Sequence, residues 1–428
     1  MKKTMRYFYF LFFLFFPSFL FAYLDPGTGS LLLYALVGIG TSLWFLLRGV
    51  FYQLSSLLFA RNNIRTKNKY GIVFYSEGAK YWQVFYPVIS QLLSQKIACT
   101  YITCEKDDPA FQLQNTDFTA LCPGTEMFTI AFMNKIEADI VVSTTPHLDV
   151  YMWKRSKKVK KYIHIFHAPT GVDFYEKYAL SFYDVIFSVG EFIENAQKYL
   201  DKARGLPDKT YYNVGCTYYD YMHEKLQTLK RTTKTKTILY APSWGLKRSS
   251  FFTNGIPIMQ RLLDAGFRVI FRPHPQFFIS HKKELENFKN QFAHYQSLTI
   301  DTAPSPLQAM LDSDILISDF SGIVFDFAYL FERPVFLTLP PSSVKGYEAE
   351  ELPADIQWDI PATQQVAHEL SENEINHIEN YISDVLEQER NYKNRIAEFK
   401  KNIFNFYTAG HSAARAISDI HTSLRASL

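Results

Sequence analysis

The chain has 428 residues, of which 47% are hydrophobic and 20% are charged, and its formal net charge is +3. This length allows two domains plus an attachment segment, and so small a net charge argues against a nucleic-acid-binding protein. The cysteines form no CxxC pair, so we expect buried free thiols in a reducing compartment rather than a metal site. They are Cys99, Cys104, Cys122 and Cys216.

Two uncharged apolar runs occupy residues 7–24 and 31–47, separated by a turn-like sequence. A membrane-spanning helix needs about 20 mostly apolar residues, and both runs are close to that length. Two interpretations remain open for the first run. It is either a cleaved signal peptide, with the small residue Ala22 near its end, or the first arm of a transmembrane hairpin.

Basic residues flank the two runs, with Lys2, Lys3 and Arg6 before the first and several Lys and Arg residues after the second. Because basic flanks stay on the cytoplasmic side, both interpretations leave the remainder of the chain in the cytosol. We therefore expect residues 1–69 to be a membrane anchor and linker. The catalytic domains would lie on the cytoplasmic side of the cell inner membrane.

Residues 70–229 alternate short apolar runs with helical patterns, which predicts βαβ units and a parallel sheet. The fold class is therefore α/β. The expected strands are 71–75, 97–102, 139–143, 162–166 and 184–189, and the expected helices are 81–93 and 128–136.

His167 directly follows the strand expected to end at Phe166. The carboxyl ends of parallel strands are where ligands bind. A histidine there can take a proton from a hydroxyl nucleophile, because its ordinary pKa is near neutral. A hydrogen-bonded structural histidine is the alternative. Asp173 is near enough in sequence to orient the His167 ring, and Asp319 is the second candidate for an orienting carboxylate.

A polar segment of Lys, Arg and Thr at 230–236 predicts an interdomain linker, and a second α/β pattern occupies residues 237–428. The residues after 362 read as a mostly helical tail, with 373–386 as one helix. The expected strands are 237–240, 267–271, 298–300, 315–317 and 334–337, and the expected helices include 256–263 and 307–311.

The second half is organised around the stretch 312–330, which reads as a strand, a Ser-Asp-Phe-Ser-Gly turn and a helix. Ser321 can cap that helix and Gly322 lets a ligand approach the backbone. The helix N-terminus offers N–H groups and a positive dipole end, which suits a phosphate. The alternative is an ordinary strand–turn–helix.

Arg272 and His274 emerge from another strand end, in the rigid sequence Arg-Pro-His-Pro. A fixed cation and hydrogen-bond donor beside an anion site suit a diphosphate, and Ser243 could be a third contact. A rigid turn with a surface arginine is the alternative.

Together these motifs resemble the CDP-glycerol glycerophosphotransferase family of teichoic acid synthesis. The resemblance covers about residues 140 to 345. It rests on His167, on Arg-Pro-His-Pro at 272–275, on Tyr-Ala-Pro-Ser-Trp at 240–244, and on Ser-Asp-Phe-Ser-Gly at 318–322 with Phe-Asp-Phe at 325–327.

The resemblance implies a GT-B-like fold, in which two Rossmann-like domains face a cleft and a terminal helix crosses back. Residues 70–229 would be the acceptor domain and residues 237–428 the donor-nucleotide domain. His167 would be the catalytic base, and His274 would match a second catalytic position. Arg272, Ser318, Ser321 and Gly322 would contact the donor diphosphate. Ala168 and Gly245 depart from the family pattern. These two departures concern the identity of the substrate rather than the fold.

The implied reaction moves a polyol phosphate, such as glycerol phosphate, from a CDP-activated donor to a hydroxyl of a lipid-linked acceptor at the inner membrane. CMP leaves. No cofactor or metal is expected, because the Asp312–Asp314 pair precedes its strand and faces no cleft. Two alternatives remain open: a nucleotide-sugar glycosyltransferase of the same fold, and a non-catalytic membrane-tethered scaffold of an envelope assembly complex.

Overall fold

The structure is a computed structural model that describes residues 36–44, 69–244, 249–319, 321–338, 344–387 and 389–426. Residues 1–65 and residues 66–428 form two separate compact units. In the first unit, residues 36–44 are helical and their side chains are exposed, including Leu36, Ile39 and Trp44.

Among the residues that the structure describes, no helix is long and apolar enough to cross a membrane. The predicted apolar run 7–24 and most of the run 31–47 lie outside the described residues. The two predicted membrane segments therefore stay predictions.

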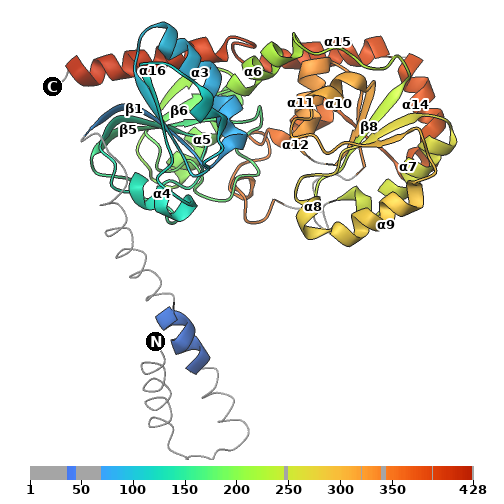
Figure 1. Cartoon of the computed structure of the whole chain (residues 1–428), viewed down its shortest axis with the longest axis horizontal. Helices are drawn as coiled ribbons and strands as arrows, with labels where there is room; N and C mark the ends of the chain where they lie inside the picture. Colours follow the sequence, from blue (N-terminus) through green and yellow to red (C-terminus); the bar gives the residue numbers. More distant parts are fainter. Residues whose placement is uncertain are drawn as a thin grey trace, which may run out of the picture. The chain divides into compact units, whose positions relative to one another are not determined.

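The first half of the large unit is built on a parallel sheet of seven described strands in the order β3-β2-β1-β4-β5-β6-β7 (Figure 1). The central strands β1 and β4 are buried along all or nearly all of their length, as expected for a sheet that helices cover on both faces. The strands are β1 Tyr70–Ser76, β2 Cys99–Thr103, β3 Phe118–Leu121, β4 Ala138–Ser143, β5 Val159–Ile165, β6 Val185–Ser188 and β7 Thr210–Asn213. The helices are η1 Ala79–Tyr81, α3 Trp82–Ser94, η2 Pro109–Gln112, α4 Glu126–Met133, α5 Glu191–Ala203 and α6 Thr217–Leu226.

The second half repeats this plan with a sheet of six described parallel strands in the order β10-β9-β8-β11-β12-β13. The strands are β8 Thr237–Ala241, β9 Arg268–Phe271, β10 Leu298–Ile300, β11 Ile315–Ser318, β12 Val335–Leu337 and β13 His368–Glu369. The helices are η3 Ser250–Phe252, α7 Gly255–Asp264, α8 Phe277–Ser280, α9 Lys282–Phe292, α10 Leu307–Asp312, α11 Ile323–Phe331, η4 Glu348–Glu350 and α12 Asp359–Val366. The α/β prediction is confirmed.

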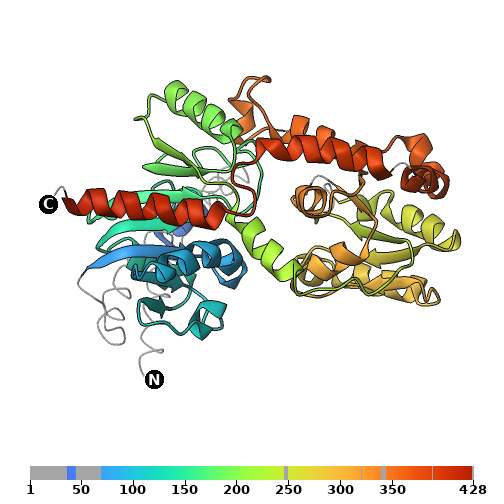
Figure 2. The same cartoon turned by 90° about the horizontal axis from the view of Figure 1, so that it is seen from above.

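The helical tail divides between the two halves. It consists of α13 Glu372–Asn376, α14 Ile378–Glu387, α15 Glu389–Phe399, η5 Lys400–Asn402 and α16 Ala409–Ala426. The single helix predicted at 373–386 is thus two helices. Helix α15 packs against α11 and α12, whereas α16 lies on α3 and α6 of the first half (Figure 2). A Cβ on Gly410 would lie 2.8 Å from Pro87 Cβ, so glycine permits the close approach of α16 to α3.

In each sheet the chain reverses its direction of strand addition once, between β1 and β4 and between β8 and β11. Ligands of open α/β sheets bind outside the carboxyl ends of the strands at such a switch point. In the second sheet these strand ends lead into Ser243 and Asp319. In the first sheet they lead into Glu77 and Thr144, and His167 follows the neighbouring strand β5.

The segment after β12 returns to the first half and pairs with the loop that follows β5. Glu348 N donates to Tyr175 O at 2.8 Å, and Ala349 N donates to Asp173 O at 3.0 Å. The Arg204 guanidinium forms an ion pair with the buried Glu348 carboxylate. The two halves are therefore joined by backbone hydrogen bonds and a buried ion pair as well as by the linker.

Candidate active site

A pocket of about 300 Å³ lies where the two halves meet. From the first half it takes residues of the loop after β5, and from the second half the start of α11 together with two later residues. These are Thr170, Gly171, Phe174 and Tyr175, then Ser321, Gly322 and Phe325, then Tyr347 and Asp359. The pocket joins the loop that begins at His167 to the Ser321–Gly322 turn, two segments that the sequence singled out separately.

The N-terminus of α11 opens on this pocket, but Ser321 does not cap it. The N-cap residue is Gly322, with helical dihedral angles of φ −57° and ψ −27°, and no side chain caps the helix. The helix begins at Ile323, directly after this glycine, and Ser321 lines the pocket instead of capping the helix. A Cβ on Gly322 would meet no atom of the described part of the chain within 4 Å, so these residues leave the space beside it open to a ligand.

His167 lies three residues before the pocket-lining Thr170. Its ring packs edge-on against Tyr81 at a centroid distance of 5.5 Å. Its Nδ1 atom is buried and has no hydrogen-bond partner among the described residues. Burial, and then the Lys80 charge, lower the His167 pKa to about 4. The ring is therefore neutral at pH 7 and able to accept a proton.

Asp173 makes no hydrogen bond to His167 among the described residues, so the structure does not show the predicted direct orienting contact. Its Oδ2 atom accepts hydrogen bonds from Trp358 N at 2.7 Å and from Asp359 N at 2.8 Å. The physical reason is that these two N–H groups lie in the loop entering α12 and at its first residue, where backbone donors need side-chain acceptors. Asp173 thus connects the two halves instead.

Ser318 and Asp319 hold the switch point of the second sheet together. Ser318 Oγ donates to Ala241 O at 2.6 Å and is fully buried. Asp319 Oδ2 accepts from Ser243 N at 2.9 Å, from Ser243 Oγ at 3.0 Å and from Ser250 N at 3.0 Å. Asp319 therefore orients the loop after β8 and no histidine. The hydroxyls of Ser318 and Ser243 bond within the protein and neither residue lines the cleft pocket, so their predicted contact with a diphosphate stays a prediction.

Arg272 and His274 do not line the cleft pocket. Arg272 forms a largely buried ion pair with Asp301, so its charge is already matched. His274 is exposed, its Nδ1 accepts from Gln276 N at 3.2 Å, and its ring stacks on Trp244 at 6.1 Å. Partial burial lowers the His274 pKa. Of the predicted donor contacts, the structure brings Ser321 and Gly322 into the pocket and leaves these two outside it.

Sequence reasoning missed Asp359 and Tyr347 in the pocket, and Glu77 at the first switch point. Burial raises the Asp359 pKa to about 8, with Asp173 as the second cause. Burial also raises the pKa of Glu77, which lies beside Thr145. A signal for Glu77 existed, because it lies two residues after the end of the predicted strand 71–75. Asp359 carried no such signal, because it begins a helix far from any motif.

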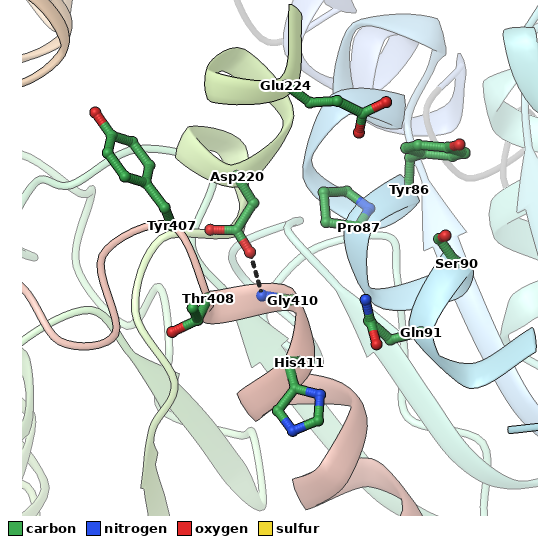
Figure 3. A pocket seen from close by; sticks show the side chains of 10 residues that line it. All are labelled: Tyr86, Pro87, Ser90, Gln91, Asp220, Glu224, Tyr407, Thr408, Gly410 and His411. Carbon is green, nitrogen blue, oxygen red and sulfur yellow. Dashed lines mark hydrogen bonds between the residues drawn. The ribbon is translucent and has the colours of Figure 1, made fainter. Parts of the chain in front are cut away.

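A second pocket of about 270 Å³ lies between α3, α6 and the start of α16 (Figure 3). There Asp220 accepts hydrogen bonds from Gly410 N at 2.7 Å and Ala409 N at 3.2 Å. Asp220 thus fixes the N-terminus of the terminal helix. This pocket shares no lining residue with the cleft pocket.

Comparison with known proteins decides the family. The sequence model of the CDP-Glycerol:Poly(glycerophosphate) glycerophosphotransferase family matches residues 59–422. The chain belongs to this family. The resemblance drawn from the motifs is confirmed, and it extends well beyond the range 140 to 345 on which it was based.

A curated relative is the teichoic acid poly(glycerol phosphate) polymerase of Bacillus spizizenii strain W23, which is 30% identical over 150 residues. That match covers 31% of this chain and only 36% of the relative. This match therefore does not show that the chain has the whole activity of that polymerase.

Solved structures show the fold. A wall teichoic acid polymerase, TagF, soaked with CDPG has 15% identity and a TM-score of 0.54, covering 91% of this chain and 98% of the other. The UDP-GlcNAc 2-epimerase of Neisseria meningitidis has 13% identity and a TM-score of 0.52, covering 83% and 100%. The GT-B-like fold of two parallel sheets is thus confirmed.

Proposed function

We propose that this family member transfers glycerol phosphate, or a related polyol phosphate, from a CDP-activated donor to a hydroxyl of a lipid-linked cell-envelope acceptor. Family membership supports the class of reaction. The observation that carries the proposal is the cleft pocket, where the loop following His167 meets the N-terminus of α11. An anionic diphosphate gains from the N–H groups and the dipole at such a helix start.

In the proposed mechanism His167 takes the proton of the acceptor hydroxyl. The acceptor oxygen then forms a bond to the phosphorus of the polyol phosphate, and the bond from that phosphorus to the bridging oxygen breaks. CMP leaves with the bridging oxygen. An anionic donor bound near His167 would raise the pKa of the imidazolium and so strengthen the base. The second half would hold the donor and the first half the acceptor.

We further propose that residues 1–69 tether the enzyme to the inner membrane with its catalytic part in the cytosol. The exposed apolar side chains of helix 36–44 support this, because a lipid environment would cover them. Protease added to right-side-out and inside-out membrane vesicles tests it. Digestion of the catalytic part only in inside-out vesicles is expected, whereas digestion in right-side-out vesicles would contradict the orientation.

The reaction is tested by measuring CMP released from CDP-glycerol by the full chain in detergent, with and without a membrane lipid extract. His167→Ala is compared with His294→Ala, which removes an exposed histidine away from the pocket. We expect release that needs the extract, a loss of about 100-fold or more in His167→Ala, and an unaffected control. Release of the nucleotide from a nucleotide sugar, but no release of CMP from CDP-glycerol, would show that the enzyme uses a different donor. No release from any donor would favour a scaffold.

A further inference from the structure

We propose that Asp359 is a positioning residue for His167, and that it acts while sharing a proton with Asp173. This inference rests on the proposed function for the role of His167. It rests on the geometry of two buried carboxyl groups that the mechanism above does not use. One belongs to the loop after β5 and the other begins α12, so the pair spans the two halves.

The two acids are joined by reciprocal backbone hydrogen bonds. Asp173 Oδ2 accepts from Asp359 N at 2.8 Å and from Trp358 N at 2.7 Å. Asp359 Oδ1 in turn accepts from Gly171 N at 2.7 Å. Each carboxyl group therefore binds the backbone of the segment that carries the other. Neither group can move without disturbing both segments.

The two remaining carboxyl oxygens converge beside Gly171. Asp359 Oδ2 lies 3.2 Å from the position that a Cβ on Gly171 would take, and Asp173 Oδ1 lies 3.4 Å from the same position. Asp173 Oδ1 is buried without a hydrogen-bond partner among the described residues. Asp173 is 1% exposed and Asp359 is 3% exposed. Two negative charges so close and so buried are strongly disfavoured, and one shared proton relieves both costs.

Among the residues that the structure describes, no cation faces the pair and would neutralise it instead. The titratable groups that face Asp359 are Asp173 and Tyr175 on the loop after β5 and Tyr329 on α11. Burial raises the pKa of both tyrosines, so they remain uncharged. The Asp359 pKa is raised to about 8 by burial and then by Asp173. At pH 7 Asp359 is therefore the protonated partner, and its O–H can donate to Asp173.

This pair fixes the loop that carries His167. The buried Nδ1 of His167 makes no hydrogen bond to a described residue, so the ring is placed by its backbone and by packing on Tyr81. Gly171, four residues further on, is tied to α12 by its bond to Asp359. Above pH 8 both carboxyls ionise and repel each other, which displaces this loop and with it His167.

Three variants test the proposal: Asp359→Asn, Asp359→Ala and the control Asp355→Asn, which changes an exposed acid four residues away. Asparagine keeps an acceptor for Gly171 N and permanently supplies the donor that protonated Asp359 supplies. We expect the wild-type rate of CMP release to fall above about pH 8. In Asp359→Asn this fall should disappear, and at pH 7 its rate should exceed that of Asp359→Ala by about tenfold. The rate of CMP release by Asp355→Asn should depend on pH in the same way as the wild-type rate.

An alkaline fall that persists in Asp359→Asn would overturn the proposal, and so would equal rates in the asparagine and alanine variants. If the wild type releases no CMP from any donor, the proposed function fails, and thermal unfolding then tests the acid pair alone. Because the folded pKa of Asp359 is raised from 3.8 to about 8, its protonation stabilises the fold fully below pH 3.8, and this stability is lost progressively as the pH rises from there to about 8. The melting temperature should therefore fall more steeply with pH in the wild type than in Asp359→Asn. Equal slopes would refute the shared proton.

Discussion

The ion pair between Arg204 and Glu348 gives the sharpest test of how the two halves are held together. Arg204 follows α5 in the first half, and Glu348 lies in the segment that returns from the second. Their side chains are 7% and 1% exposed. Arg204 also donates from Nε to Glu351 at 2.9 Å and from Nη1 to Ser181 at 3.2 Å. One side chain thus anchors the returning segment at two carboxylates.

Replacing Arg204 by alanine leaves the Glu348 charge buried, with Ala179 N as its remaining hydrogen-bond donor at 3.1 Å. Removing one partner of a buried pair costs about 3–5 kcal/mol of unfolding free energy. Glu351 contributes little to this loss, because it is 29% exposed and keeps Lys177 at 3.2 Å. The double variant Arg204→Met with Glu348→Met should recover most of the loss, since two apolar side chains need no charge partner.

Urea unfolding of the full chain in detergent measures these differences. The matched control is Lys198→Ala on α5, which removes an exposed pair with Glu194 and should cost about 0.3–0.5 kcal/mol. If Arg204→Ala costs no more than this control, the pair does not hold the returning segment and the reasoning fails. If the double variant is less stable than Arg204→Ala, the loss comes from packing rather than from an unpaired charge.

Three further predictions follow from the same structure. The kcat/KM for CMP release should fall as pH drops through about 4, where the neutral ring of His167 becomes protonated; a fall centred near 6.5 would show that the pKa is not lowered. Ser318→Ala should cost about 1–3 kcal/mol in urea unfolding, because the Ala241 carbonyl loses its donor, and should leave the KM for the donor unchanged. Trp358→Ala should cost about 3 kcal/mol by the same method, because it removes a ring stacked on Phe192 at 3.8 Å.

The sequence predicted most of the strands because parallel strands buried on both faces read as continuous apolar runs. Strands β3, β7 and β13 were not predicted, because they lie at the edges of their sheets and are only partly buried. The terminal helix α16 lies in the tail that was predicted to be mostly helical, although its own bounds were not predicted. Its packing on the first half was expected only through the family resemblance, because nothing local in the sequence encodes a contact with α3.

The candidate site was predicted in part. Residues at strand ends were found because their position is encoded locally, as with His167 and Gly322. What a serine or aspartate at a strand end binds depends on the neighbouring strand. Ser318 therefore read as a ligand contact and Asp319 as an orienting carboxylate, but Ser318 bonds to the last residue of β8 and Asp319 to the loop after it. Asp359 was missed because its partner, Gly171, lies 188 residues away in the sequence.

Binding of CDP-glycerol to wild type and to Gly322→Leu, measured by titration calorimetry, tests the central claim most directly. A side chain at residue 322 meets no atom of a described residue within 4 Å of its Cβ and needs no unusual backbone, so the fold should lose at most about 1 kcal/mol. The leucine would project into the space that we assign to the donor. We expect CDP-glycerol binding to be abolished while the melting temperature stays close to that of the wild type. An unchanged Kd would show that the donor does not bind at the start of α11, and the account of this site would be wrong.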